Sequence, residues 1–157
     1  MAIPRNGFIR CAATGLCLDV PVDIPTGAKI TQQWFSRNWT QFWHFTPRGE
    51  AAVPGRFGGQ TFPCFVIETQ HGGKCIDVPS GTMSATSLQL YPTNLGSNQL
   101  WVFVPVNEGD QVGVFHHVFC KQTGLCFDMP NGAFIPGLPV SQFPFNGGSN
   151  QWWNISE

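Results

Sequence analysis

Hydrophobic residues in this chain occur in short runs bounded by turn-forming residues. The runs Phe8–Cys11 and Leu16–Val20 flank the pair Thr14–Gly15, which is a turn signal between two strand-like segments. Two further strand-like runs follow, near Ile30–Trp34 and at Trp43–Phe45. The pattern therefore predicts a hairpin and two more strands in the first part of the chain.

Glycine and proline, which favour turns, occur along the rest of the sequence as well. The 18 Gly and 13 Pro are scattered over the whole length, where they would interrupt long helices every few residues. The chain has 157 residues, of which 42% are hydrophobic, including 14 Phe and 6 Trp. This is enough apolar surface for one domain with a real core. We therefore expect a single all-β domain over residues 1–157.

The strand pattern belongs to an internal repeat that occurs three times. Each copy carries a Cys-x-Asp element ending in Pro and, later, a Gln-x-Trp element. The separation from the Asp to the Gln is 22, 22 and 23 residues, so chance is a poor explanation. The approximate repeats are 6–58, 59–113 and 114–157. The paired elements are Gly15–Pro21 with Gln41–Trp43, Gly73–Pro79 with Gln99–Trp101, and Gly124–Pro130 with Gln151–Trp153.

Four strands per repeat give about twelve strands with pseudo-three-fold symmetry. In the second repeat the matching strands are expected at Ser87–Tyr91 and Leu100–Val104. Twelve short strands can close a small barrel with a hairpin cap, which leaves no long sheet edge exposed. Because residues i and i+2 of a strand face the same side, the Trp of Gln-x-Trp is predicted to fill the core. The Gln beside it can satisfy backbone groups at the end of the strand.

The Cys-x-Asp element followed by Gln-x-Trp, three times over, resembles the ricin B-type lectin family from Phe8 to Ile155. That family consists of β-trefoils that bind carbohydrate. The resemblance implies an all-β β-trefoil and a lectin that recognises galactose or N-acetylgalactosamine through up to three repeat-related sites. In that family a site combines the Asp, an aromatic ring and the Asn-Gln pair.

These residue types suit the chemistry of a sugar. A carboxylate can accept charge-assisted hydrogen bonds from neighbouring hydroxyls, an aromatic face can stack on the C–H patch of a pyranose such as galactose, and an amide can both donate and accept. The second repeat matches this pattern best. Its predicted site consists of Asp77, Gln89, Tyr91, Asn98 and Gln99.

The third and first repeats match less completely. In the third, the ring is predicted to be Phe143, and Ser141 takes the place of Gln89; the site residues are Asp128, Phe143, Asn150 and Gln151. In the first, Thr40 stands where the other copies have Asn, although Trp34 offers the largest stacking surface. The predicted residues there are Asp19, Gln32, Trp34 and Gln41.

The net charge, the hydrophobic pattern and the N-terminal segment indicate which partners and which location to expect. The net charge is −1, only 11% of residues are charged, and no basic run occurs, so nucleic-acid binding is not expected. Membrane insertion is not expected either, because no window is long and apolar enough. The segment Met1–Arg10 lacks the apolar region of a signal peptide, which indicates a cytoplasmic or non-classically released protein, or a secreted one if the sequence has been trimmed. A homodimer would add avidity to several weak sites.

The six cysteines leave two interpretations open. Cys11 and Cys17 are spaced like Cys120 and Cys126, which could form disulfides across hairpins, or all could be buried thiols. The remaining pair, Cys64–Cys75, breaks the spacing. No Cys-x2-Cys motif or matching His spacing indicates zinc, and no cofactor is expected.

Two other classes of function compete with a lectin. A protein-binding β-trefoil, such as a protease inhibitor or a toxin-targeting subunit, would use long loops, for example Arg48–Pro63 or Val106–Gly113. Enzymatic activity is not predicted, because no nucleophile and base occur in a recognisable context. Cleavage of a glycosidic bond would need two carboxyls within about 10 Å, whereas the repeated Asp residues are expected far apart.

Overall fold

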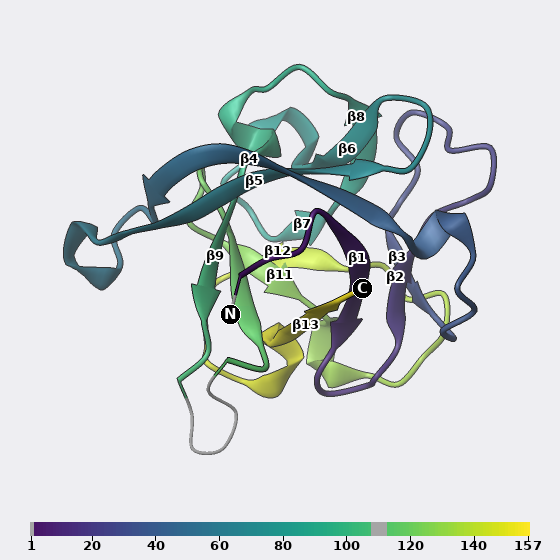
Figure 1. Cartoon of the computed structure of the whole chain (residues 1–157). Helices are drawn as coiled ribbons and strands as arrows, with labels where there is room; N and C mark the ends of the chain where they lie inside the picture. Colours follow the sequence, from purple (N-terminus) through teal and green to yellow (C-terminus); the bar gives the residue numbers. More distant parts are fainter. Residues whose placement is uncertain (1, 108–112) are drawn as a thin grey trace.

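A computed structural model describes residues 2–107 and 113–157 of the chain. Six strands close into a ring, because β1 pairs with both β4 and β13, and β5, β9 and β10 complete the circuit between them. Figure 1 shows this barrel from the side on which the long β4–β5 hairpin crosses it. The ring strands are β1 (Asn6–Cys11), β4 (Trp43–Ala52), β5 (Thr61–Thr69), β9 (Trp101–Pro105), β10 (His116–Cys120) and β13 (Trp153–Ser156).

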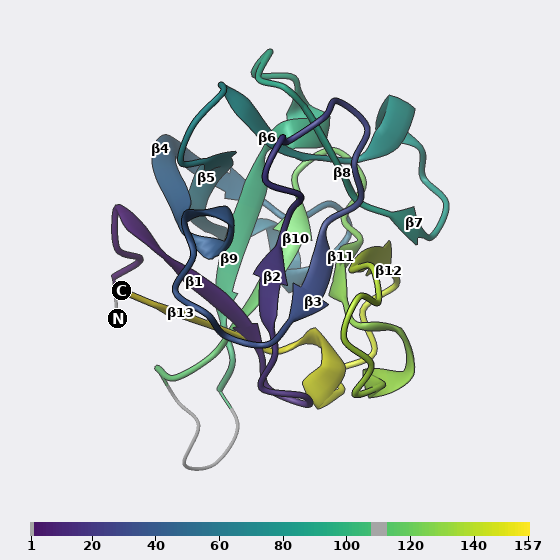
Figure 2. The ribbon, with the colours of Figure 1, turned by 90° about the vertical axis from the view of Figure 1, so that its right-hand side faces the viewer.

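Three hairpins extend from the ring and form a cap. They are β2 (Cys17–Asp19) with β3 (Thr31–Gln33), β6 (Lys74–Asp77) with β8 (Gln89–Pro92), and β11 (Cys126–Asp128) with β12 (Ser141–Phe143). The short strand β7 (Thr86–Ser87) joins the second hairpin to the third, and single bridges join the first hairpin to both others. Figure 2 shows β2, β3, β11 and β12 on one face. We name β1–β4, β5–β9 and β10–β13 the first, second and third units.

The expectation of an all-β trefoil with about twelve strands is confirmed, with thirteen strands observed in residues 2–107 and 113–157. The extra one is β7, which is separated from β8 where a single continuous strand was predicted at Ser87–Tyr91. Short 3-10 turns link the strands, and the described residues contain no α-helix. These turns are η1 (Trp39–Gln41), η2 (Phe57–Gly59), η3 (Pro79–Gly81), η4 (Ser97–Gln99), η6 (Pro130–Gly132) and η7 (Ser149–Gln151).

The tryptophans of the three Gln-x-Trp elements lie in the core, as predicted. Trp43, Trp101 and Trp153 are fully buried. Each indole N–H donates a hydrogen bond to a backbone carbonyl of its own unit's cap hairpin, at Leu18 (3.4 Å), Ile76 (3.0 Å) and Phe127 (3.1 Å) respectively. Because a buried indole needs such a partner, these bonds tie the barrel wall to the cap in all three units.

The segment Arg48–Pro63, predicted as a loop, has strand at both of its ends, which belong to β4 and β5. Its two ends pair across β4 and β5 from Glu50 opposite Pro63 to Ala52 opposite Thr61, after an irregularity that follows Pro47. The loop prediction was wrong for these two ends, because their Gly and Pro residues were interpreted as loop signals, although a bulged edge hairpin tolerates both. The other predicted loop, Val106–Gly113, and the end of the second repeat include residues 108–112, which lie outside the described residues.

The six cysteine side chains are buried free thiols. Burial raises the pKa of Cys17 and of Cys75 to about 12, which makes these thiols poor nucleophiles. Within residues 2–107 and 113–157, no cluster of three or more potential metal ligands is found. The same residues contain no helix that is long and apolar enough to span a bilayer.

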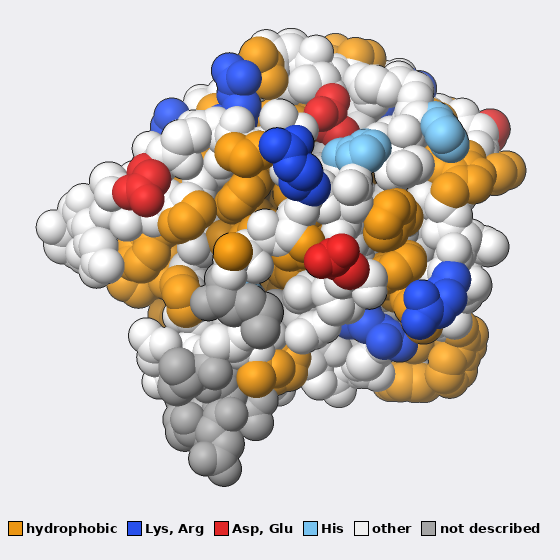
Figure 3. Space-filling model, viewed as in Figure 1, with side chains coloured by type: hydrophobic (Ala, Val, Ile, Leu, Met, Phe, Trp, Pro, Cys, Tyr) orange, Lys and Arg blue, Asp and Glu red, His pale blue; other side chains and the backbone are white. Residues whose placement is uncertain are grey.

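The surface carries few charges. On the face in Figure 3, charged side chains of both signs are scattered among exposed hydrophobic ones. This distribution agrees with a net charge of −1 over the whole chain.

Candidate functional site

Each unit places one aspartate at the end of its first cap strand, beside the glutamine of its Gln-x-Trp element. The glutamine Nε2 donates to the aspartate Oδ2 in all three units. The distances are 3.0 Å for Gln41 to Asp19, 2.9 Å for Gln99 to Asp77, and 2.9 Å for Gln151 to Asp128. The repeat seen in the sequence therefore pairs a buried amide with a carboxylate.

The three glutamines were expected to contact a ligand, and the structure corrects this. Gln41, Gln99 and Gln151 are fully buried. Each Nε2 also donates to a backbone carbonyl, of Trp34, Pro92 and Pro144 respectively, at 2.8–3.0 Å. Each Oε1 accepts from a backbone N–H in the loop before the turn. Because both amide hydrogens of each glutamine are already donated within the protein, these side chains position the aspartates and are not available to a ligand.

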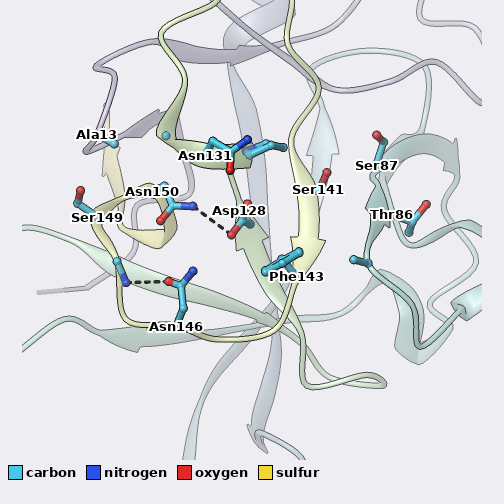
Figure 4. Close-up of a pocket in the computed structure, with 14 residues that line it drawn as sticks. Ala13, Thr86, Ser87, Asp128, Asn131, Ser141, Phe143, Asn146, Ser149 and Asn150 are labelled. Carbon is cyan, nitrogen blue, oxygen red and sulfur yellow. Dashed lines mark hydrogen bonds between the residues drawn. The ribbon is translucent and has the colours of Figure 1, made fainter.

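The third unit opens into a hollow of about 940 Å³. Asp128 lies at its floor, with Asn150 on one side and the half-exposed ring of Phe143 on the other (Figure 4). The far wall comes from Thr86 and Ser87 of the second unit. The structure therefore brings together the carboxylate, the ring and the asparagine predicted for this unit.

The carboxylate of Asp128 has one oxygen committed and one open. Oδ2 accepts hydrogen bonds from Asn150 Nδ2 (3.1 Å) and from Gln151, whereas Oδ1 accepts none from the described residues. Burial raises the pKa of Asp128, and the hydrogen bonds from Gln151 and Asn150 oppose that rise. Asn150 Nδ2 also donates to the Met129 carbonyl at 3.1 Å, so only its Oδ1 is left to meet a ligand.

Several polar residues of this hollow were not predicted. Asn131 lies above Asp128 at the tip of the turn Pro130–Gly132, with a φ of +57°, a conformation that asparagine tolerates better than most residues. Asn146 and Ser149 line the opposite edge. The Pro-Asn-Gly sequence after Asp128 is a turn signal that could have indicated Asn131.

The second unit has the predicted residues, but its carboxylate is more fully engaged. Asp77 Oδ1 accepts from Gln89 Nε2 at 3.0 Å, while Oδ2 accepts from Asn98 (3.2 Å) as well as from Gln99. Tyr91 lies opposite Cys75 and is 41% exposed. Phe143, 43% exposed, has the same register opposite Cys126. The best sequence match therefore has the less available carboxylate.

Gln32 of the first unit was predicted to contact a ligand, but the structure buries it completely. Its Nε2 donates to the carbonyls of Ala133 (2.7 Å) and Ile135 (3.1 Å), and its Oε1 accepts from Thr14 Oγ1. It therefore joins the first unit to the third. Gln142 joins the third unit to the second in the same way.

The register of the first unit also differs from the prediction for Trp34. Thr31 lies opposite Asp19, so Gln33 lies opposite Cys17 at the position of Tyr91 and Phe143. Trp34 is the next residue along the chain, and its side chain is 62% exposed. It still lines a hollow of about 670 Å³ together with Asp19 and Asn38. Thr40, which replaces the asparagine, is buried.

Solved structures share this fold. The designed three-fold symmetric protein ThreeFoil matches with a TM-score of 0.82 and 23% identity, over 98% of this chain and 99% of that chain. An exo-beta-1,3-galactanase from Clostridium thermocellum matches at 0.76 and 23%, over 98% of this chain and 31% of that chain. A Macrolepiota procera ricin B-like lectin in complex with lactose matches at 0.74 and 16%, over 99% and 97%.

No protein-family model and no curated protein sequence matches this chain. The resemblance to ricin B-type lectins is confirmed by structural similarity at the level of the fold. The chain is a β-trefoil with the architecture of those lectins.

Proposed function

We propose that this β-trefoil is a carbohydrate-binding lectin for glycans that end in galactose or N-acetylgalactosamine, with its principal site in the third unit. The observation that carries the proposal is the open Oδ1 of Asp128 on the floor of a hollow beside an exposed ring, Phe143. A buried carboxylate with an unused acceptor favours a ligand that supplies a hydroxyl.

The chemistry of the third unit suits one sugar residue. A hydroxyl of the sugar donates to Asp128 Oδ1, and a neighbouring hydroxyl donates to Asn150 Oδ1, whose amide nitrogen is already committed. The C–H face of the pyranose stacks on Phe143. Ser141, which lies opposite Asp128 where the second unit has Gln89, leaves room at the carboxylate.

Three repeat-related sites on one domain can provide the avidity that a single shallow site lacks. In the second and first units, the buried glutamines likewise donate hydrogen bonds to Oδ2 of Asp77 and of Asp19. If these sites bind weakly, clustered glycans gain affinity through several simultaneous contacts. The likeness to a galactanase carries no catalytic assignment, because this fold covers 31% of that enzyme's chain.

The test is a titration of the protein with galactose, N-acetylgalactosamine and glucose, followed by NMR. We expect the two galactose-type sugars to shift resonances around Asp128, and Phe143→Ala to weaken their binding on the order of tenfold. Phe143 is preferable to Asp128 for this purpose, since removing Asp128 leaves buried amides without an acceptor. Tyr91→Ala is the matched control in the second unit.

Two results would contradict the proposal. The first is that none of the sugars binds. The second is that a sugar-insensitive protein partner is captured through this same face, which would favour a protein-binding β-trefoil.

A further inference from the structure

Trp34 and Phe134 form an aromatic pair on the surface, although they belong to different units. Trp34 follows β3 in the first unit and is 62% exposed; Phe134 follows η6 in the third and is 53% exposed. Their ring centroids are 5.3 Å apart at an interplanar angle of 71°. Two large rings exposed side by side leave apolar area in water, which a ligand can cover.

The backbone on both sides of Phe134 is held in place. Gln32 Nε2 donates to the carbonyls of Ala133 and Ile135, the two neighbours of Phe134. The Gly137 N–H donates in turn to the Gln32 carbonyl at 2.7 Å. This clamp fixes the segment on β3 and directs the ring outward beside Trp34. The pair is thus part of the rigid junction between the first and third units.

The pair adjoins the hollow of the first unit. Trp34 lines this hollow together with Asp19 and with Gly137 of the third unit. Asp19 Oδ1 accepts one hydrogen bond from the Val20 N–H at 2.7 Å and Oδ2 accepts one from Gln41 at 3.0 Å, so each oxygen keeps a second lone pair for a hydroxyl. The register position next to the carboxylate, which holds a ring in the other units, is occupied by Gln33. In the first unit, therefore, the aromatic surface does not lie at the register position beside the carboxylate. It lies at the rim of the hollow, where Phe134 adds to the surface of Trp34.

We infer that the first unit binds an oligosaccharide, with one sugar residue at Asp19 and the next stacked on the Trp34–Phe134 pair. This inference rests on the proposed carbohydrate-binding function and adds that this unit selects chain length. We expect one sugar residue to engage either the Asp19 carboxylate or the displaced rings, and two linked residues to engage both. In the third unit the ring lies beside the carboxylate, so one terminal residue is enough.

The experiment compares galactose with a β-1,4-linked galactotriose in a Tyr91→Ala/Phe143→Ala background, where the other two units lack their rings. We expect the trisaccharide to bind about tenfold tighter than galactose and to shift the Trp34 indole N–H resonance. Adding Trp34→Ala or Phe134→Ala should remove this gain and bring the affinity for the trisaccharide down to that for galactose. Met83→Ala is the matched control, because Met83 occupies the equivalent clamped segment of the second unit and is also exposed.

The outcomes separate the inference from the proposed function. If Trp34→Ala and Phe134→Ala weaken both ligands equally, or weaken neither, the inference is overturned while sugar binding stands. If the trisaccharide binds no tighter than galactose in the ring-deleted background, the inference is likewise overturned. Failure of the wild-type protein to bind either ligand refutes both.

Discussion

The side-chain amide of Gln151 donates a hydrogen bond to Asp128 Oδ2 over 2.9 Å, and this bond joins the repeat that builds the fold to the candidate site. The same amide donates to the Pro144 carbonyl at 2.9 Å, while its oxygen accepts from the Asn146 N–H at 2.8 Å. One buried side chain therefore holds the floor and one edge of the hollow. In every unit, the equivalent glutamine therefore serves both the fold and the candidate site.

Gln151→Leu tests that connection. The leucine keeps the volume but leaves Asp128, the Pro144 carbonyl and the Asn146 N–H without their partner, each a buried or partly buried polar group. We expect the free energy of unfolding to fall by about 1–3 kcal/mol and sugar binding in the third unit to be lost, measured by urea denaturation and NMR titration. Gln99→Leu should cost similar stability but spare that binding. Equal loss of third-unit binding in both variants would contradict a local role.

The tryptophans provide a second comparison, between a core ring and a surface ring. Trp101→Ala should lower the free energy of unfolding by about 3–5 kcal/mol, because it leaves a cavity and removes the partner of the Ile76 carbonyl. Trp34→Ala should change it by no more than about 0.5 kcal/mol, since the side chain is largely exposed. Urea denaturation monitored by far-UV circular dichroism measures both. Comparable losses would mean that Trp34 contributes to the fold.

The parts of the molecule that repeat in sequence were predictable. The nearly constant spacing between Asp and Gln-x-Trp indicated three units, and the Trp of that element was predicted to fill the core, as Trp43 and Trp153 confirm. The thirteenth strand could not be foreseen, because β7 exists through pairing with β12 of another unit. Contacts between units depend on how the three units dock, which the spacing within one unit does not express.

The details of the sites were less predictable, because they depend on register. Assigning Trp34 the position of Tyr91 misplaced the first unit by one residue, and a shift of one reverses which side of a strand each residue faces. Gln32, a polar residue, faces inward to bind backbone carbonyls, which a hydrophobic pattern does not reveal. Likewise, the hydrogen bond from Gln89 to the Asp77 carboxylate depends on the cross-strand pairing, which the sequence does not give.

Acidity should distinguish the carboxylate of the third unit. Burial raises the pKa of Asp128, and its ionised form is the better acceptor for sugar hydroxyls. We therefore expect galactose affinity in that unit to fall on acidification at a pH above the range of an ordinary aspartate, measured by titrations over a pH series. In Asp128→Asn the affinity should be weak and no longer follow this titration. A pH-independent affinity in the wild type would argue against a hydroxyl bound at Asp128.

His116 is a titratable group that the candidate sites do not use. It lies on β10 between Pro105 and Trp153 of the neighbouring strands and is buried. Its Nδ1 has no hydrogen-bond partner among the described residues, and the centroids of its ring and the Phe103 ring are 6.1 Å apart at an interplanar angle of 64°. Burial, with the adjacent His117 adding to it, lowers the pKa of His116 to about 4.

This depressed pKa predicts acid sensitivity. An unfolded histidine has a pKa of about 6.5, so between pH 6.5 and 4 the unfolded chain binds a proton that the folded chain does not. Stability should therefore fall as the pH decreases through that window, by about 3 kcal/mol in total, in urea denaturation at a series of pH values. His116→Phe, which keeps an aromatic ring beside Phe103, should remove this part of the slope, whereas His44→Gln on β4 should retain it. If His116→Phe loses stability with acid as steeply as the wild type, another group controls the transition.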